Sequence, residues 1–120
     1  MEPIIDHIEI TVKDMATAVR VVPYEHPRLG FAITSPLQAF ASDTINRRKP
    51  GALHHLAFRA KSRADVDRLY VELQAIGATI EHPPREYPEY TPAGYYALYF
   101  KDLEGIKYEI VCTVREGECR

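Results

Sequence analysis

The sequence contains an internal repeat, and this repeat limits the folds open to the chain more than any other feature. A shift of 48 positions aligns the segment 7–13 with the segment 55–61. Apolar and polar residues alternate along both segments, as in a strand with one buried face. The identical pairs are His7/His55, Lys13/Lys61, Ala16/Ala64 and Arg20/Arg68. We infer that the chain contains two related copies of one structural unit.

Each copy of the repeat predicts a strand followed by a helix. In the first copy, the alternation predicts a strand over 4–12, and Asp14 can cap the helix that follows. In the second copy, a strand is expected over 53–60, and Ser62 can begin a helix with apolar residues at helical spacing. Gly77 suits the position just past the end of that helix.

The two copies continue with different numbers of expected strands. After its helix, the second copy predicts strands near 78–82, 95–101 and 106–114. The first copy offers only 31–34 and 37–42 before a polar stretch. The order of elements is that of an α+β fold, in which the first copy is reduced.

Strand alternation selects the side chains that share one face of the expected sheet. In the first strand, His7 and Glu9 lie opposite the apolar residues that should meet the helix. The repeat places His55 on the same face as His7, and it places His54 on the helix side. In the last strand, Glu109 also lies on the face opposite the helix.

Two imidazoles and one carboxylate on one sheet face form a donor set for a divalent metal ion. The residues are His7, His55 and Glu109. This set suits Zn²⁺, Mn²⁺, Fe²⁺, Ni²⁺ or Co²⁺, and it leaves coordination positions open for a substrate. Any one of these residues alone would be read as an ordinary polar residue on a hydrated face. The equivalent repeat positions of the two histidines favour the metal site.

Composition excludes several classes of function. The chain has 120 residues and a formal charge of −2 without a basic run, so nucleic acid is not an expected partner. It has no apolar stretch of membrane-spanning length and no signal-peptide pattern at its start, so we expect a cytoplasmic protein without a membrane partner. Cys112 and Cys119 are too far apart for a CxxC pair and are expected to be free thiols.

The sequence resembles the vicinal oxygen chelate superfamily, which includes glyoxalase I, fosfomycin-resistance enzymes, extradiol dioxygenases and bleomycin-resistance proteins. The segments that carry the resemblance are 6–10, 51–58 and 100–110. The resemblance implies a single domain over 1–120, in which two βαβββ modules form a cupped mixed sheet with helices on its outer face. The modules are expected at about 1–50 and about 51–114, followed by a tail at 115–120. The family further implies a metal in the cup and a homodimer.

By motif position, the family's metal ligands fall on His7, His55 and Glu109. The family's cavity tyrosine, found in fosfomycin-modifying relatives, falls on Tyr99. Two departures from the family pattern reduce the set of reactions that we expect. The segment 37–43 offers only Gln38 as a remote candidate for the fourth ligand of glyoxalase I. Glu9 replaces a small hydroxyl residue of the fosfomycin enzymes and would oppose an anionic phosphonate.

These observations predict a metal-dependent lyase, isomerase or transferase that stabilises an oxyanion or enolate of a small oxygenated substrate. Glu9 is the candidate general base, although it could equally be a solvated carboxylate or a partner of Arg59 or Lys107. Tyr95 and Tyr99 could donate a hydrogen bond to the oxyanion or simply pack. The alternatives are an Fe(II) extradiol-type dioxygenase and an antibiotic-sequestering protein without catalysis. No residue is assigned to an organic cofactor.

Overall fold

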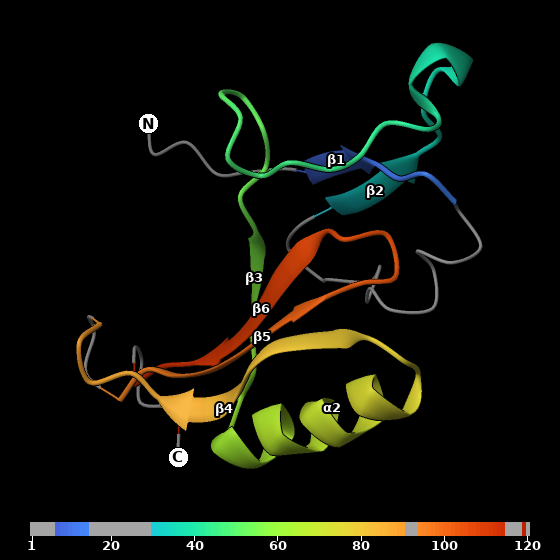
Figure 1. Ribbon diagram of the computed structural model, residues 1–120. Coiled ribbons are helices and arrows are strands. Elements are labelled where there is room, and N and C mark those ends of the chain that lie inside the picture. The colour runs from blue at the N-terminus through green and yellow to red at the C-terminus, as the bar shows by residue number, and fades with distance from the viewer. Residues whose placement is uncertain (1–6, 15–29, 91–93, 115–118, 120) are drawn as a thin grey trace. The chain divides into compact units, whose positions relative to one another are not determined.

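The computed structural model describes residues 7–14, 30–90, 94–114 and 119. The chain divides into two compact units, residues 1–44 and residues 45–120 (Figure 1). No helix of the described residues is long and apolar enough to span a membrane.

The first unit contains two parallel strands, β1 (His7–Thr11) and β2 (Gly30–Thr34). The pairing continues one step beyond β1, where the backbone N–H of Val12 donates to the carbonyl of Thr34 at 2.9 Å. The helix that we expected after Asp14 falls on residues 15–29, which lie outside the described residues.

The strand expected over 37–42 is wrong, because this segment forms the short 3₁₀ helix η1 (Gln38–Phe40) and a turn. The backbone N–H of Phe40 donates to the carbonyl of Leu37 at 2.9 Å, so local hydrogen bonds replace those of a ladder. The side chains of Leu37 and Phe40 are exposed. Alternating apolar residues therefore do not mark a buried sheet face here.

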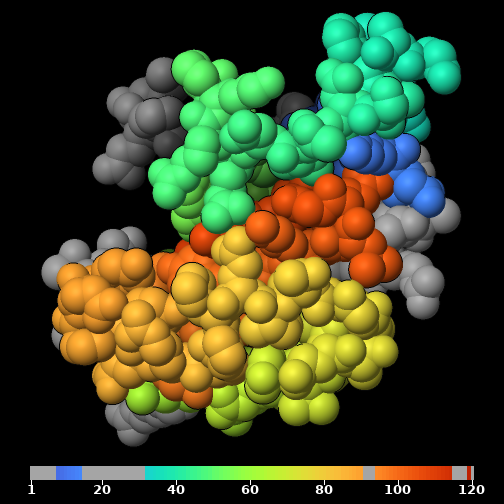
Figure 2. All heavy atoms as spheres, in the orientation of Figure 1, coloured from blue at the N-terminus to red at the C-terminus, as the bar shows by residue number. Residues whose placement is uncertain are grey.

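The second unit is one βαβββ module. Its elements are β3 (Leu56–Arg59), α2 (Arg63–Ala75), β4 (Thr79–Glu86), β5 (Tyr96–Lys101) and β6 (Lys107–Cys112). The sheet order is β3-β6-β5-β4, with β3 parallel to β6 and the other two pairs antiparallel. Helix α2 packs against β4, β5 and β6, and its atoms lie beside those of β4 in the space-filling view (Figure 2). The expected second module is thus confirmed in its order of elements.

The start and end of α2 follow the expected signals. The Ser62 side chain caps the helix by accepting a hydrogen bond from the backbone N–H of Asp65 at 3.1 Å. Val66 and Leu73 are buried and anchor the helix to the sheet. Gly77 follows the helix with a φ of 82°, a left-handed conformation that favours glycine.

A tight turn at Asp102 fixes the register of β5 and β6. The buried Asp102 carboxylate accepts hydrogen bonds from the backbone N–H groups of Glu104 and Ile106, at 2.9 and 3.0 Å. The turn sets Tyr99 directly opposite Glu109 in the antiparallel pair. Tyr99 and Glu109, which are ten positions apart in the sequence, are thereby neighbours across the two strands.

The two faces of this sheet separate as the alternation predicts. On one face, the Tyr108 ring stacks on those of Phe58 and Phe100, with centroids 6.2 and 5.5 Å away. The opposite face, which we call the site face, carries a second cluster. Its members are Tyr87, Ala97 and Tyr99, with Tyr95 and Val111 packed against them.

The expectation of two free thiols is wrong, because Cys112 and Cys119 form a disulfide with a Cα–Cα distance of 5.3 Å. Cys112 is the last residue of β6, and both cysteines are buried. The spacing of seven positions does not match a metal-binding or redox pair. A separation of seven positions is nonetheless sufficient for a disulfide between the two residues.

Candidate metal centre

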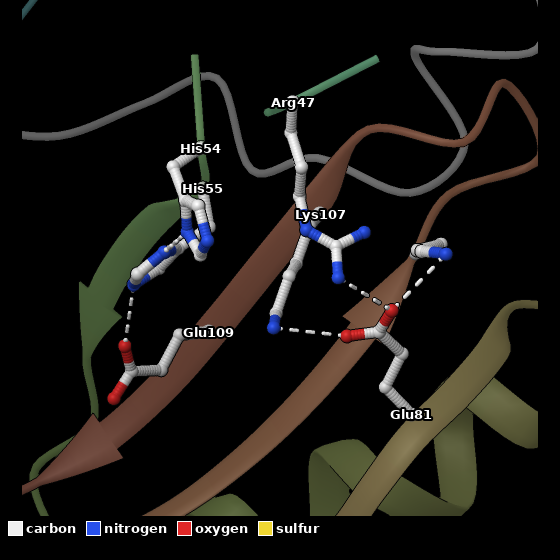
Figure 3. A network of polar contacts seen from close by, with 7 residues as sticks. Arg47, His54, His55, Glu81, Lys107 and Glu109 are labelled. Atoms are coloured by element: carbon white, nitrogen blue, oxygen red, sulfur yellow. Dashed lines mark hydrogen bonds and ion pairs between the residues drawn. The ribbon is translucent and has the colours of Figure 1, made fainter. Parts of the chain in front are cut away.

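Glu109 is a buried carboxylate in the middle of strand β6. It pairs with Ala57 of β3 on one side and with Tyr99 of β5 on the other, and its side chain is 2% exposed. Its Oε2 atom lies 3.0 Å from Nε2 of His55 (Figure 3). Its Oε1 atom accepts a hydrogen bond from the hydroxyl of Tyr95. Both carboxylate oxygens are thus partnered, as a buried charge requires.

His55 lies directly before β3 and is half-buried. One ring nitrogen, Nε2, faces Glu109, and the other, Nδ1, lies 2.7 Å from Nδ1 of His54. One of the two Nδ1 atoms must carry the proton and the other must accept it. The contact with Oε2 of Glu109 requires a proton on Nε2 of His55, and a metal ion bound there would take the place of that proton.

The placement of His54 on the helix side is wrong. Its ring lies beside that of His55, with centroids 5.0 Å apart and the ring planes at 70°. The reason is that β3 begins only at Leu56, so strand alternation does not govern residue 54. The pKa of His54, an exposed side chain, is lowered by desolvation, by the neighbouring His55 and by the cations Arg48, Lys107 and Arg47. A neutral His54 can share one hydrogen bond with Nδ1 of His55.

Tyrosines form the wall beside Glu109. The Tyr99 ring lies 6.0 Å from the His55 ring and 5.7 Å from the Tyr87 ring. Burial, and then the nearby charge of Glu109, raises the pKa of Tyr99. Burial and the hydrogen bond to Glu109 likewise raise the pKa of Tyr95. Both hydroxyls therefore stay protonated at neutral pH and act as donors, not as bases.

The donor atoms of His55 and Glu109 fit a shared divalent ion. Two ligands of a tetrahedral zinc site with bonds of about 2.0–2.1 Å lie roughly 3.3 Å apart. The observed separation of 3.0 Å between Nε2 and Oε2 is close to that value. Within the described residues, however, no group of three or more His, Cys, Asp or Glu side chains gathers as a metal site.

The remaining expected residues belong to the first unit. His7 is the first residue of β1, and its side chain lies outside what the structure describes, so its role as a ligand stays a prediction. Glu9 lies in the same strand with an exposed side chain, and its role as a base also stays a prediction. Lys107, which we had considered as a partner of Glu9, forms an ion pair with Glu81 at 3.0 Å.

Glu81 of β4 was missed by the sequence reasoning. One oxygen of its carboxylate forms an ion pair with Lys107 at 3.0 Å (Figure 3). The other oxygen forms ion pairs with Lys101 at 3.0 Å and with Arg47 at 3.4 Å. The only sequence signal was that Lys107 shares the strand face of Glu109. Nothing in the local pattern marked its partner on β4.

Comparison with known protein families matches residues 25–110 to the Glyoxalase/Bleomycin resistance protein/Dioxygenase superfamily. The chain belongs to this superfamily. The matched range takes in the βαβββ module except for the last two residues of β6, and it includes His55 and Glu109. The resemblance inferred from the sequence is therefore confirmed.

One curated protein is similar to the chain in sequence, and solved structures share its fold. It is 30% identical over 90 residues to the uncharacterized protein YqjT of Bacillus subtilis, covering 75% of this chain and 69% of the relative. A superfamily domain from Frankia sp. aligns with a TM-score of 0.74 at 22% identity, covering 98% and 95% of the two chains. A lactoylglutathione lyase from Agrobacterium tumefaciens aligns with a TM-score of 0.63 at 19% identity, covering 92% and 94%.

Proposed function

We propose that this protein is a divalent-metal-dependent enzyme that acts on a small oxygenated compound as a lyase, isomerase or transferase. The observation that carries the proposal is the convergence of His55 Nε2 and Glu109 Oε2 at 3.0 Å on the site face. His55 and Glu109 would hold the ion together with His7. A bound ion would act as an electrophile toward the substrate's oxygen atoms.

The residues around this pair support a role in handling negative charge. Tyr99 is a protonated donor on the same face, and we propose that it hydrogen-bonds the oxygen on which charge develops. Tyr95 is engaged with Glu109 and would keep that carboxylate in position. Glu9 is the proposed general base, since it lies two positions from His7 along β1.

An Fe(II) dioxygenase is the second candidate, because two histidines and one carboxylate are also the ligand set of such enzymes. Metal analysis of the protein purified without added metal separates the two functions. Iron together with loss of activity in air would support the dioxygenase, whereas Mn, Ni, Zn or Co would support the first proposal. Protein without any metal would support sequestration of a ligand without catalysis.

We further propose that the protein forms a homodimer. Within the described part of the chain, β3 is an edge strand that pairs only with β6. Backbone N–H and C=O groups at such an edge can pair with another strand, and a second copy of the chain can supply that strand. Sedimentation at micromolar concentration tests this, and a monomer would contradict it.

The metal assignment is tested by comparing two carboxylate variants. Glu109→Gln should emerge depleted of metal, because two histidines alone hold a divalent ion weakly. Glu9→Gln should retain the metal, and it should lose about 10²–10⁴-fold in turnover once a substrate is known. Metal content by elemental analysis is the readout. Retention by Glu109→Gln together with loss by Glu9→Gln would overturn the assignment.

A further inference from the structure

Three cations surround the single carboxylate of Glu81. Lys107 and Lys101 each lie 3.0 Å from one of its oxygens, and Arg47 lies 3.4 Å away. Ion pairs with these cations outweigh burial and lower the pKa of Glu81 to about 2, so it is ionised at neutral pH. These four side chains together carry one negative and three positive charges, a sum of two positive charges.

The cluster also contains a donor without a partner. The Nε atom of Arg47 is buried and makes no hydrogen bond within the part of the chain that the structure describes. A buried N–H group left in this state costs free energy, which an added acceptor would recover. The ammonium of Lys107 has three N–H donors and, among the described residues, forms an ion pair with one carboxylate, that of Glu81. The cluster thus has spare capacity for an anion.

This positive cluster adjoins the candidate metal centre. Lys107 and Glu109 are two positions apart in β6, so they share the site face and their Cα atoms lie about 6.5–7 Å apart. The Lys107 Nζ atom lies 4.9 Å from the centre of the Tyr99 ring, and that ring lies 6.0 Å from the His55 ring. A small molecule at His55 and Glu109 could therefore reach Lys107 past Tyr99.

We propose that Arg47 and Lys107 form a subsite for an anionic group of the substrate, a carboxylate or a phosphate. This inference rests on the proposed function and narrows its substrate class to small oxygenated anions. Arg47 offers a planar fork of donors for two oxygens, and Lys107 offers a compact charge. Glu81 holds both cations in place while leaving their excess charge for the ligand.

The test is a titration of the 120-residue chain, stripped of metal, with inorganic phosphate and separately with acetate. Backbone amide shifts in two-dimensional NMR spectra report binding, at low and constant ionic strength because salt screens such contacts. We expect saturable shifts around Lys107 in the unmodified protein. The anion with the lower Kd identifies whether the subsite prefers a phosphate or a carboxylate. Acetamide, which is neutral and of similar shape to acetate, should not bind.

Variants assign the binding to the cluster. Lys107→Gln and Arg47→Gln should each raise the Kd at least tenfold, whereas Lys49→Gln, at an exposed lysine of the same loop region as Arg47, should stay within twofold. If Lys107→Gln fails to fold, Arg47→Gln decides the matter alone. Values for Arg47→Gln within twofold of the unmodified protein would overturn the subsite.

Metal binding measured on the same samples keeps the two proposals apart. Arg47→Gln should bind Zn²⁺ as well as the unmodified protein does. An unmodified protein that binds phosphate at this cluster but binds no metal would overturn the proposed function and leave the anion site standing. Normal metal binding with no phosphate binding would overturn the subsite alone.

Discussion

His55 and Glu109 are 54 positions apart in the sequence, yet the Nε2 atom of His55 lies 3.0 Å from the Oε2 atom of Glu109. The parallel pairing of β3 with β6 brings them together, because Glu109 lies opposite Ala57, two positions beyond His55. A residue two positions away in or near a strand returns to the same face. The contact is thus a consequence of sheet register.

The adjacent histidines should respond differently to substitution. His55→Ala should abolish stoichiometric metal binding, because it removes the nitrogen that faces Glu109. His54→Ala should keep the stoichiometry and weaken the affinity by roughly 10-fold, because it removes only the Nδ1 partner that orients His55. Titration with Zn²⁺ and a competing chelator measures both. Loss of stoichiometric binding in His54→Ala alone would show that the roles are reversed.

Tyr95 should stabilise the fold through Glu109. Tyr95→Phe removes a hydroxyl that donates to a carboxylate with 2% side-chain exposure, so we expect a loss of about 1–3 kcal/mol in the free energy of unfolding. Urea denaturation at pH 7 measures it. Tyr90→Phe is the matched control, since Tyr90 packs in the same aromatic cluster with a more exposed side chain. Equal losses in the two variants would contradict the role of Tyr95.

Sequence alone predicted the βαβββ order of the second unit and the side chains of its site face. These features depend on local rules: alternation along β5 and β6 places Tyr99 and Glu109 on one face, and the Ser62 cap begins α2. The choice of His55 came from the repeat. Such signals are contained within a few neighbouring residues, or within two matching segments, and can be read without knowledge of the tertiary fold.

The ion cluster at Glu81 could not be predicted in this way. The pairing of β4 with β5 has a register shift between Ile80 and His82, so simple alternation does not apply around residue 81. Arg47 reaches the cluster from a turn-rich loop with no periodic pattern. The disulfide was not predicted for a similar reason, because Cys119 lies beyond β6. Contacts made by bulges, loops and tails depend on the path of the chain in three dimensions.

The disulfide should contribute to stability and bears on the expected compartment. Closing a loop of seven positions should stabilise the fold by about 2–3 kcal/mol, so reduction should lower the melting temperature by several degrees. Cys119→Ser should show a similar loss without reductant and no further change with it.

Disulfides are uncommon in the cytosol, whereas we expected a cytoplasmic protein. Mass spectrometry after alkylation of the freshly isolated protein counts the thiols, and two alkylated cysteines would mean that the bond is absent there.

Ionisation of Glu81 should make the free energy of unfolding depend on pH. Its pKa in the folded protein is about 2, below the ordinary value of 4.5, so the folded state favours the ionised form. The stabilisation is therefore complete above about pH 4.5 and is lost as the pH falls toward 2. At pH 7, Glu81→Gln should cost about 1–3 kcal/mol, a value reduced by solvent screening of the partly exposed lysines.

The difference between this variant and the unmodified protein is the quantity to follow. Below the folded pKa, protonated Glu81 is neutral like glutamine, so the difference should shrink toward zero between pH 4.5 and pH 2.5. Glu72→Gln, at an exposed position of α2, should stay close to the unmodified protein throughout. Chemical denaturation at pH 7, 5, 3.5 and 2.5 provides the comparison. A cost of Glu81→Gln that stays constant over this range would mean that the three cations do not hold the carboxylate in its ionised form.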